Sequence, residues 1–123
     1  MLWQRRPVSN KNKGASYEEA AKRLTEKAGF KTIGQNYFCR GGELDIICGR
    51  KNTLCFIEVK YRKSNSHALE QVTRAKQQRI LLAAKTYLNE NKQYQNHVIR
   101  FDVIAITSLQ NELQFYWIEN AFY

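Results

Sequence analysis

The sequence lacks several features that would assign it to a familiar class of protein. It has no apolar run long enough to span a membrane, and no hydrophobic segment near its start that would mark a secretory signal. It contains neither internal repeats nor low-complexity segments. These absences exclude a membrane-spanning helix and a repeat architecture, and we expect no membrane partner.

Cysteine is scarce and has no metal-binding spacing. Cys39, Cys48 and Cys55 are an odd number with no C-x-x-C pair, which predicts neither a zinc site nor a disulfide framework. All three lie in apolar, strand-like contexts that are typical of reduced, partly buried thiols. We therefore expect a cytoplasmic protein.

Negative charge is also in short supply. Twenty Lys and Arg residues against eleven Asp and Glu give a formal net charge of +9. An excess of this size favours a polyanionic partner, most often nucleic acid, over a merely soluble basic protein. The length of 123 residues predicts one domain, residues 14–123, preceded by a basic flexible arm, residues 1–13.

The rest of the chain alternates between helical and strand-like patterns. Helical periodicity predicts helices over Ala15–Ala28 and Leu69–Asn91. Alternating or apolar runs predict strands over Phe30–Arg40, Glu43–Gly49, Thr53–Tyr61, His97–Thr107 and Glu112–Glu119. Because a strand, a helix and another strand form a crossover, His97–Thr107 is expected to lie parallel to Thr53–Tyr61.

The predicted hairpin from Gly42 to Arg62 carries the most informative charges. A two-residue turn at Lys51–Asn52 places Asp45 directly across from Glu58, and a four-residue turn makes them diagonal neighbours on the same face. Like charges in these positions destabilise a ladder, so the two acids require a compensating cation. Lys60, on the same face as Glu58, supplies part of that charge, and a divalent metal ion would supply more. Strand alternation puts the apolar side chains of Leu44, Ile46 and Cys48 together on the opposite face.

This set of residues suits phosphodiester hydrolysis. Mg²⁺ prefers oxygen ligands and keeps several waters, so Asp45, Glu58 and the carbonyl of Val59 are predicted ligands for Mg²⁺ or Mn²⁺. Such an ion would polarise the scissile phosphate, while Lys60 would orient the attacking water or stabilise the charge on phosphorus. The alternative is a solvent-facing acid pair that Lys60 neutralises.

Basic residues flank this hairpin on both sides. Arg62 and Lys63 begin a polar segment after the second strand, and Lys76 and Arg79 lie near the start of the second helix. We predict that these four contact a phosphate backbone. The alternative is an ordinary connection and a solvated helix face.

The motifs G-E-L-D and F-I-E-V-K-Y-R resemble the PD-(D/E)xK nuclease superfamily. More closely, the chain resembles the YraN family of uncharacterised bacterial endonuclease-like proteins. The resemblance includes further matches at Glu18–Ala21, Val72–Thr73, Lys76, Arg100–Val103 and Asn120–Phe122. The chain departs from the family pattern at Tyr17, where Gly is usual, and at Tyr61, where Thr is usual.

This resemblance implies a restriction-endonuclease-like α/β fold, an αβββαβ core with a mixed central sheet flanked by helices. It also implies a metal ion held by Asp45 and Glu58, with Lys60 catalytic. Similarity to archaeal Holliday junction resolvases adds Glu18 to the catalytic residues.

We therefore expect a metal-dependent endonuclease that acts on DNA rather than RNA, on branched or otherwise structured substrates. The alternative is a catalytically silent nucleic-acid-binding module on the same scaffold. A homodimer is a further expectation, with the apolar C-terminal hairpin as its seam (Tyr116, Trp117, Phe122 and Tyr123).

Overall fold

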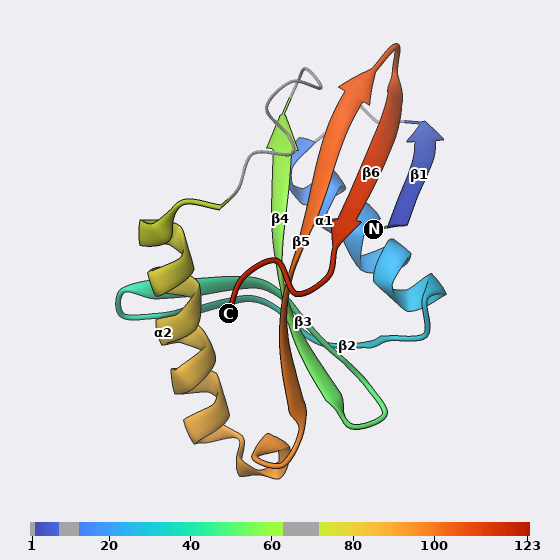
Figure 1. Cartoon of the computed structure of the whole chain (residues 1–123). Coiled ribbons are helices and arrows are strands. Elements are labelled where there is room, and N and C mark those ends of the chain that lie inside the picture. The colour runs from blue at the N-terminus through green and yellow to red at the C-terminus, as the bar shows by residue number, and fades with distance from the viewer. Residues whose placement is uncertain (1, 8–12, 63–71) are drawn as a thin grey trace.

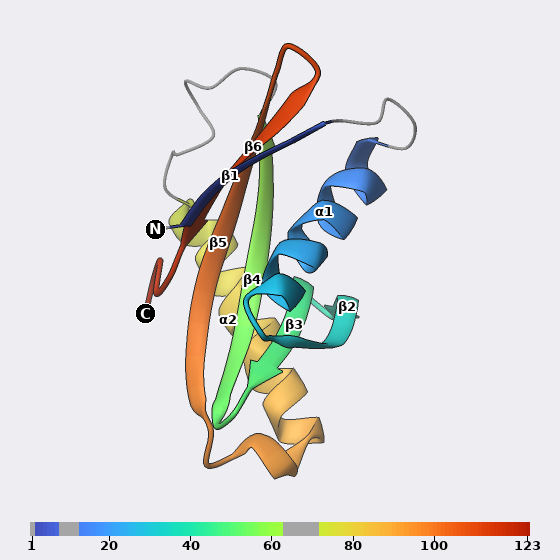
Figure 2. The ribbon, with the colours of Figure 1, turned by 90° about the vertical axis from the view of Figure 1, so that its right-hand side faces the viewer.

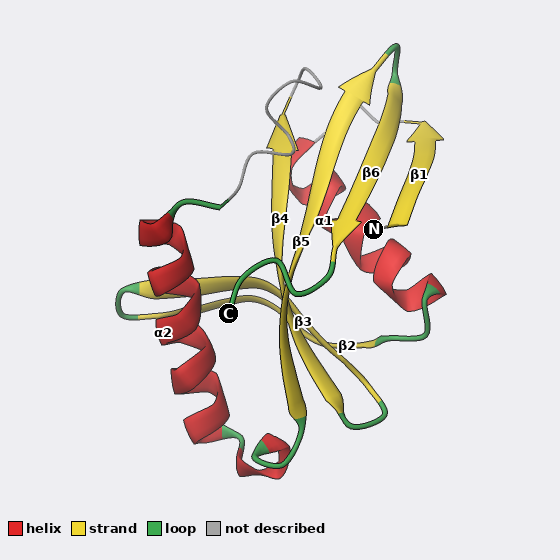
Figure 3. Ribbon diagram, viewed as in Figure 1, coloured by secondary structure: helices red, strands yellow, loops and turns green. Residues whose placement is uncertain are grey.

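The computed structural model describes residues 2–7, 13–62 and 72–123. Two long helices and six strands make up this part of the chain (Figures 1 and 3). In chain order the elements are β1 (Leu2–Pro7), α1 (Lys13–Lys27), β2 (Lys31–Cys39), β3 (Gly42–Arg50), β4 (Thr53–Arg62), α2 (Arg74–Glu90), the short 3-10 helix η1 (Lys92–Tyr94), β5 (Val98–Leu109) and β6 (Glu112–Ile118).

The six strands form one mixed sheet in the order β1-β6-β5-β4-β3-β2. The pairing of β4 with β5 is parallel, as predicted for a crossover through α2, and the other neighbouring pairs are antiparallel. The predicted αβββαβ core with a mixed sheet is confirmed, and β1 and β6 extend the sheet beyond β5.

The two long helices cover opposite faces of the sheet (Figure 2). The apolar stripe of α1, which includes Ala21 and Leu24, packs against Ile57 and Ile104, whereas Ala83 of α2 packs on the other face. Since both faces of the central strands are covered, these strands are apolar almost throughout. No helix in the described ranges is both long and apolar enough to cross a membrane.

The strict alternation expected along β3 fails at its start. Ile46 and Cys48 pack under α1, but Leu44 joins Ile47 in the cluster under α2. The prediction that Leu44 shares a face with Ile46 is therefore wrong. The physical reason is that β3 pairs with β4 only from Ile46 to Arg50, so the part before Ile46 turns with β2 alone and twists away.

The tip of the β2–β3 hairpin lies against α2 (Figure 1). Gly41 has a left-handed φ of +84°. A Cβ on Gly42 would lie 2.5 Å from the carbonyl oxygen of Arg79 and 3.0 Å from the amide nitrogen of Ala83. Both contacts are to helix backbone, so this approach of strand to helix requires glycine.

Most element boundaries lie within two residues of the sequence prediction, and two features differ by more. Residues 2–7, inside the predicted arm of residues 1–13, form β1 and pair with β6. An edge strand is held by backbone hydrogen bonds, so its sequence needs no clear alternation. The α2 helix begins at Arg74, where the Thr73 side chain caps it by accepting a hydrogen bond from the Lys76 amide, whereas residues 69–71 of the predicted helix lie outside the described residues.

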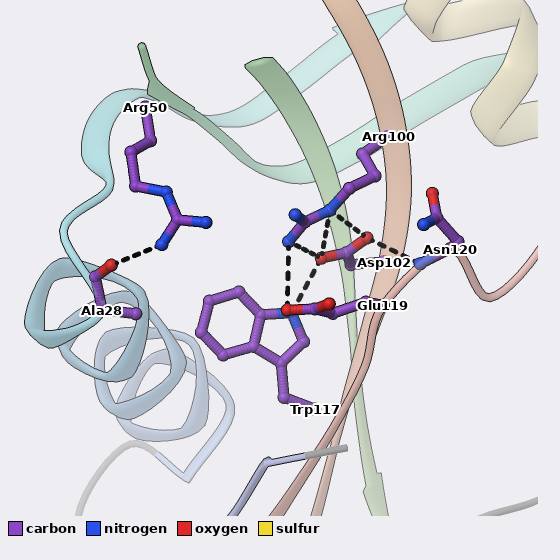
Figure 4. A network of polar contacts seen from close by, with 7 residues as sticks. All are labelled: Ala28, Arg50, Arg100, Asp102, Trp117, Glu119 and Asn120. Carbon is purple, nitrogen blue, oxygen red and sulfur yellow. Dashed lines mark hydrogen bonds and ion pairs between the residues drawn. The ribbon is translucent and has the colours of Figure 1, made fainter. Parts of the chain in front are cut away.

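A buried carboxylate ties the end of the chain to β5. Asp102 is fully buried and accepts hydrogen bonds from the Arg100 guanidinium at 2.7 Å, from Trp117 Nε1 at 2.8 Å and from the Asn120 amide at 3.0 Å (Figure 4). Glu119 lies 3.7 Å from Arg100. Arg100 and Asp102 thus pair with each other at the edge of the core.

Most of the large apolar side chains of the C-terminal hairpin are buried in the hydrophobic core of the same chain. Trp117 and Phe122 are buried in the two core clusters, and Tyr116 is half-buried, whereas Tyr123 is exposed. The residues named as a dimer seam are therefore mostly used within one chain, and a homodimer stays a prediction.

We expect Gly42→Ala to destabilise the protein by roughly 1–3 kcal/mol, because the new methyl group must push the β2–β3 hairpin away from α2. Gly34→Ala is the matched control, since a Cβ there would meet only the Ile47 side chain at 3.5 Å. Chemical denaturation of both variants measures the difference. Equal losses would show that the approach to α2 is not tight.

We expect Asp102→Asn to cost about 3–5 kcal/mol, because it leaves the Arg100 guanidinium largely buried without its anionic partner. Glu119→Gln removes a more distant and exposed partner of the same arginine and should cost under about 1 kcal/mol. Urea denaturation compares the two variants, and a loss no larger for Asp102→Asn would contradict this account.

Candidate functional site

The predicted hairpin register is confirmed. Ile46 faces Ile57 and Cys48 faces Cys55, which is the register of a two-residue turn at Lys51–Asn52. The two cysteines are buried in the cluster under α1, and their contact raises the pKa of Cys55, so they act as packing residues.

Continuing this register by one step brings Asp45 to Glu58, at the point where β3 leaves β4. Asp45 Oδ2 accepts a hydrogen bond from the Val59 amide at 2.8 Å. Glu58, when protonated, also shares a hydrogen bond with Asp45. The structure therefore brings the two predicted metal ligands into contact.

Glu58 is strongly perturbed by this environment. Its side chain is 11% exposed. Burial raises its pKa to about 8, and the charge and hydrogen bond of Asp45 act in the same direction. Glu58 therefore keeps its proton near neutral pH when no further cation is bound. A clustered pair of this kind is typical of a functional site.

Lys76 reaches this pair from the first turn of α2. Its Nζ lies 2.8 Å from Glu43 Oε1 and 3.6 Å from Glu58 Oε2. Burial acts to lower the pKa of Lys76, but the hydrogen bond to Glu43 and the charge of Glu58 outweigh it and raise the pKa. The bond from Lys76 in turn lowers the pKa of Glu43.

A pocket of about 280 Å³ opens beside these charges. Its lining comes from the end of β4 and the start of α2: Glu58, Val59, Lys60, Tyr61, Arg62, Val72, Thr73 and Lys76. Lys60 is only 9% exposed and lies in this lining two residues beyond Glu58. The predicted catalytic lysine and the predicted metal ligand Glu58 thus border the same cavity.

Glu18 approaches from the other helix. Burial raises its pKa, and the charges of Asp45 and Glu43 add to that rise, whereas a hydrogen bond from Asn36 lowers it. Glu18 therefore lies close enough to Asp45 for its pKa to respond to the charge on Asp45, and its catalytic role stays a prediction. Asn36 has a left-handed φ of 51°, an uncommon backbone for a residue within a strand.

The two departures from the family pattern contact one another. The rings of Tyr17 and Tyr61 stack with centroids 3.8 Å apart and planes 13° apart. Burial, together with a hydrogen bond to Tyr61, raises the pKa of Tyr17 to about 12. This contact joins the residue before Glu18 to the residue after Lys60, so it fixes α1 against the end of β4.

The four residues predicted to contact nucleic acid have different environments in the structure. Arg62 is exposed at the pocket mouth, and its Nη1 donates a hydrogen bond to the Tyr61 carbonyl. Lys76 lies within the acid cluster rather than at its rim. Arg79 is half-exposed, 3.7 Å from Glu43. Lys63 lies outside the described residues.

The donor set fits a hard divalent cation. Asp45 and Glu58 offer carboxylate oxygens, and Val59 lines the same pocket. The described residues contain no group of three or more His, Cys, Asp or Glu side chains placed to hold a metal ion. An ion here would thus depend on two carboxylates with main-chain and water oxygens, which is the coordination that Mg²⁺ tolerates well.

Sequence reasoning missed two residues of this site. Glu43 holds both Lys76 and Arg79. The sequence carried a signal for Glu43, because a residue two positions before Asp45 in a strand is expected on the same face as Asp45. Asn36 makes a side-chain hydrogen bond to Glu18 from a backbone with left-handed φ. The only sequence signal for this residue is that Asn tolerates left-handed φ better than most residues do.

Comparison with known proteins identifies relatives along nearly the whole chain. A family model described as "Uncharacterised protein family UPF0102" matches residues 17–106. A UPF0102 protein of Aeromonas hydrophila is 41% identical over 98% of this chain and 92% of its own length. One from Saccharophagus degradans is 42% identical over 89% of this chain and 91% of its own length.

We expect the raised pKa of Glu58 to appear in the pH dependence of stability. Since the folded state keeps a proton on Glu58 that the unfolded state releases above about pH 4.5, the free energy of unfolding should fall as the pH rises towards 8. Glu58→Gln removes this loss. In EDTA the variant should match the wild type at pH 5 and melt at least about 4 °C higher at pH 8.

The exposed Glu112 supplies the control for this measurement. Glu112→Gln should keep the wild-type pH dependence. Parallel melting curves for wild type and Glu58→Gln across this range would show that Glu58 carries no such proton.

Proposed function

This chain belongs to the uncharacterised protein family UPF0102, and on that premise we propose that it is a metal-dependent endonuclease that hydrolyses phosphodiester bonds in DNA. One observation carries the proposal. Asp45 and Glu58 come together where β3 leaves β4, and Lys60 lines the same pocket as Glu58.

Asp45, Glu58 and the main-chain carbonyl of Val59 would hold Mg²⁺ or Mn²⁺. When bound, the ion supplies positive charge that polarises the scissile phosphate and offsets the charge developing on it. It also relieves the repulsion between the two carboxylates, which the proton on Glu58 otherwise relieves. This relief explains why two acids remain on otherwise apolar strands.

The protein's own groups would position the substrate and the water. Lys60 would orient the attacking water or stabilise negative charge on phosphorus from the wall of the pocket. Glu43, which binds Lys76 and Arg79, would keep α2 and its two cations close to the scissile phosphate. Glu18, held by Asn36, would add a third acid on the side of α1.

The net charge of +9 supports a nucleic-acid substrate. Arg62 and Arg79, both exposed in part, would contact the backbone beside the pocket. We propose DNA rather than RNA, and branched or structured DNA in particular, on the resemblance to the resolvases.

A second candidate function is nucleic-acid binding without cleavage. The observation that favours it is Lys76, whose ammonium lies 3.6 Å from Glu58 and already supplies a positive charge to the acid cluster. In that case the lysine would take the place of a metal ion, and the scaffold would bind a phosphate backbone without turnover.

We expect the wild-type protein to cleave DNA in Mg²⁺ or Mn²⁺ and to lose that activity in EDTA. Linear, nicked, flapped and four-way substrates should be tested in parallel. Asp45→Asn, Glu58→Gln and Lys60→Met should each lower the rate at least about 100-fold, since each removes a metal ligand or a transition-state contact. Glu112→Gln, in an exposed turn-end position, is the matched control.

Mn²⁺ binding measured by calorimetry separates the two functions. Binding that Asp45→Asn abolishes supports the endonuclease. The silent module predicts instead that DNA binds, that Mn²⁺ does not, and that Glu58→Ala and Lys60→Ala leave DNA affinity intact.

A further inference from the structure

A second basic hollow lies at the opposite end of β4 from the candidate site. It has a volume of about 890 Å³, and its lining includes Lys31, Ile33, Arg50, Lys51 and Thr53. We call it the distal groove. Thr53, the first residue of β4, lies in the distal groove, and Arg62, the last, lies in the pocket beside Glu58.

The lining of the distal groove carries only positive formal charge. Lys31, Arg50 and Lys51 are exposed, and no Asp or Glu is among the lining residues described for it. The Arg50 guanidinium is fixed, because its Nη1 donates to the Ala28 carbonyl at 2.7 Å and its centre lies 4.3 Å above the Phe30 ring. The groove therefore has one immobilised cation and two exposed lysines in its lining.

A comparable hollow at the far end of α2 has a different charge balance. Its volume is about 700 Å³, and its lining includes Lys85 and Lys92 but also Glu90. Each hollow has two lysines in its lining. Their charges differ because the distal groove also has Arg50, whereas the hollow on α2 also has Glu90. This difference supplies a matched comparison within one molecule.

We propose that the distal groove binds the phosphate backbone of a duplex DNA whose scissile bond lies at the pocket beside Glu58. The inference rests on the proposed function and extends the bound substrate beyond the catalytic end. Glu26, outside the lining, accepts a hydrogen bond from Thr32 of the groove at 3.1 Å, and the three cations Lys31, Arg50 and Lys51 outnumber this acid. Exposed clusters of cations are typical of backbone contacts, which hold a duplex in register without reading its bases.

The length of β4 sets the spacing of the two contacts. From Thr53 to Arg62 the strand rises about 3.3 Å per residue, which places its ends roughly 30 Å apart. A DNA duplex rises about 3.4 Å per base pair, so the span corresponds to about nine base pairs. A lipid surface fits the groove less well, because Ile33 is the one aliphatic side chain in its lining as described, and it is half-buried.

The test compares two double variants that each remove two positive charges. Lys31→Gln with Lys51→Asn changes the distal groove, and Lys85→Gln with Lys92→Gln changes the hollow on α2. Asn is chosen at position 51 because Lys51 has a left-handed φ of 55°. Thermal unfolding checks that both variants fold, and the single variants Lys31→Gln and Lys51→Asn repeat the measurement separately.

Affinity is measured by fluorescence anisotropy in EDTA over a range of salt concentrations. The probes are a 30-base-pair duplex and a DNA hairpin with a six-base-pair stem. For the duplex, the distal-groove variant should bind about 10-fold more weakly, and its slope of log affinity against log salt should be shallower by about 2. The variant on α2 should bind nearly as the wild type does. The short stem cannot span both contacts, so the distal-groove variant should bind it with almost wild-type affinity.

Equal losses for the two double variants would overturn the proposal, because net charge alone would then explain them. Equal losses on the long duplex and the short stem would also overturn it. The proposal would also fail if the distal-groove variant kept its affinity for the duplex but lost binding to vesicles of anionic lipid, because the groove would then bind lipid rather than DNA. EDTA prevents cleavage, so this affinity measurement is independent of nuclease activity. If the chain binds as expected in EDTA but does not cut DNA in Mg²⁺ or Mn²⁺, the endonuclease proposal fails and the distal-groove proposal stands.

Discussion

The repulsion between two neighbouring carboxyl groups is the constraint on which the candidate site depends. Asp45 and Glu58 lie together on strands that are otherwise apolar, and burial holds the pKa of Glu58 at about 8. Such a pair costs free energy unless a proton or a cation relieves it. The surrounding structure places a positive charge nearby, because Lys76 Nζ lies 3.6 Å from Glu58 Oε2. A pocket of about 280 Å³ adjoins the pair. The site is thus poised for a positively charged ligand.

The geometry of the pair comes from the point where β3 leaves β4. From Ile46 onward β3 is paired with β4, and before Ile46 the β2–β3 hairpin turns towards α2. Gly42 permits this turn because its backbone approaches that of α2 without a Cβ between them. Ion pairs from Glu43 to Lys76 and Arg79 then hold the hairpin and helix together. Packing and electrostatics therefore fix the same hairpin orientation.

Positively charged side chains lie near both ends of β4. One end of this strand meets Lys60, Arg62 and Lys76, and the other meets the distal groove with Lys31 and Lys51. The buried bonds of Asp102 anchor the C-terminal segment to the neighbouring strand β5, away from either end. A rigid strand with cations at both ends is a suitable support for an extended polyanion.

The sequence by itself determined the order of the long helices and strands from α1 to β6, the parallel crossover and the β3–β4 register that leads to Asp45 and Glu58, because strand period and turn length are local properties that fix register. Only the tertiary structure decided how β3 twists before Ile46, that Leu44 faces α2, and that Lys76 enters the acid cluster. It also brought Tyr17 to Tyr61 and Asn36 to Glu18. These contacts join segments far apart in the chain, so they follow from how helices dock on the sheet, which no local pattern records.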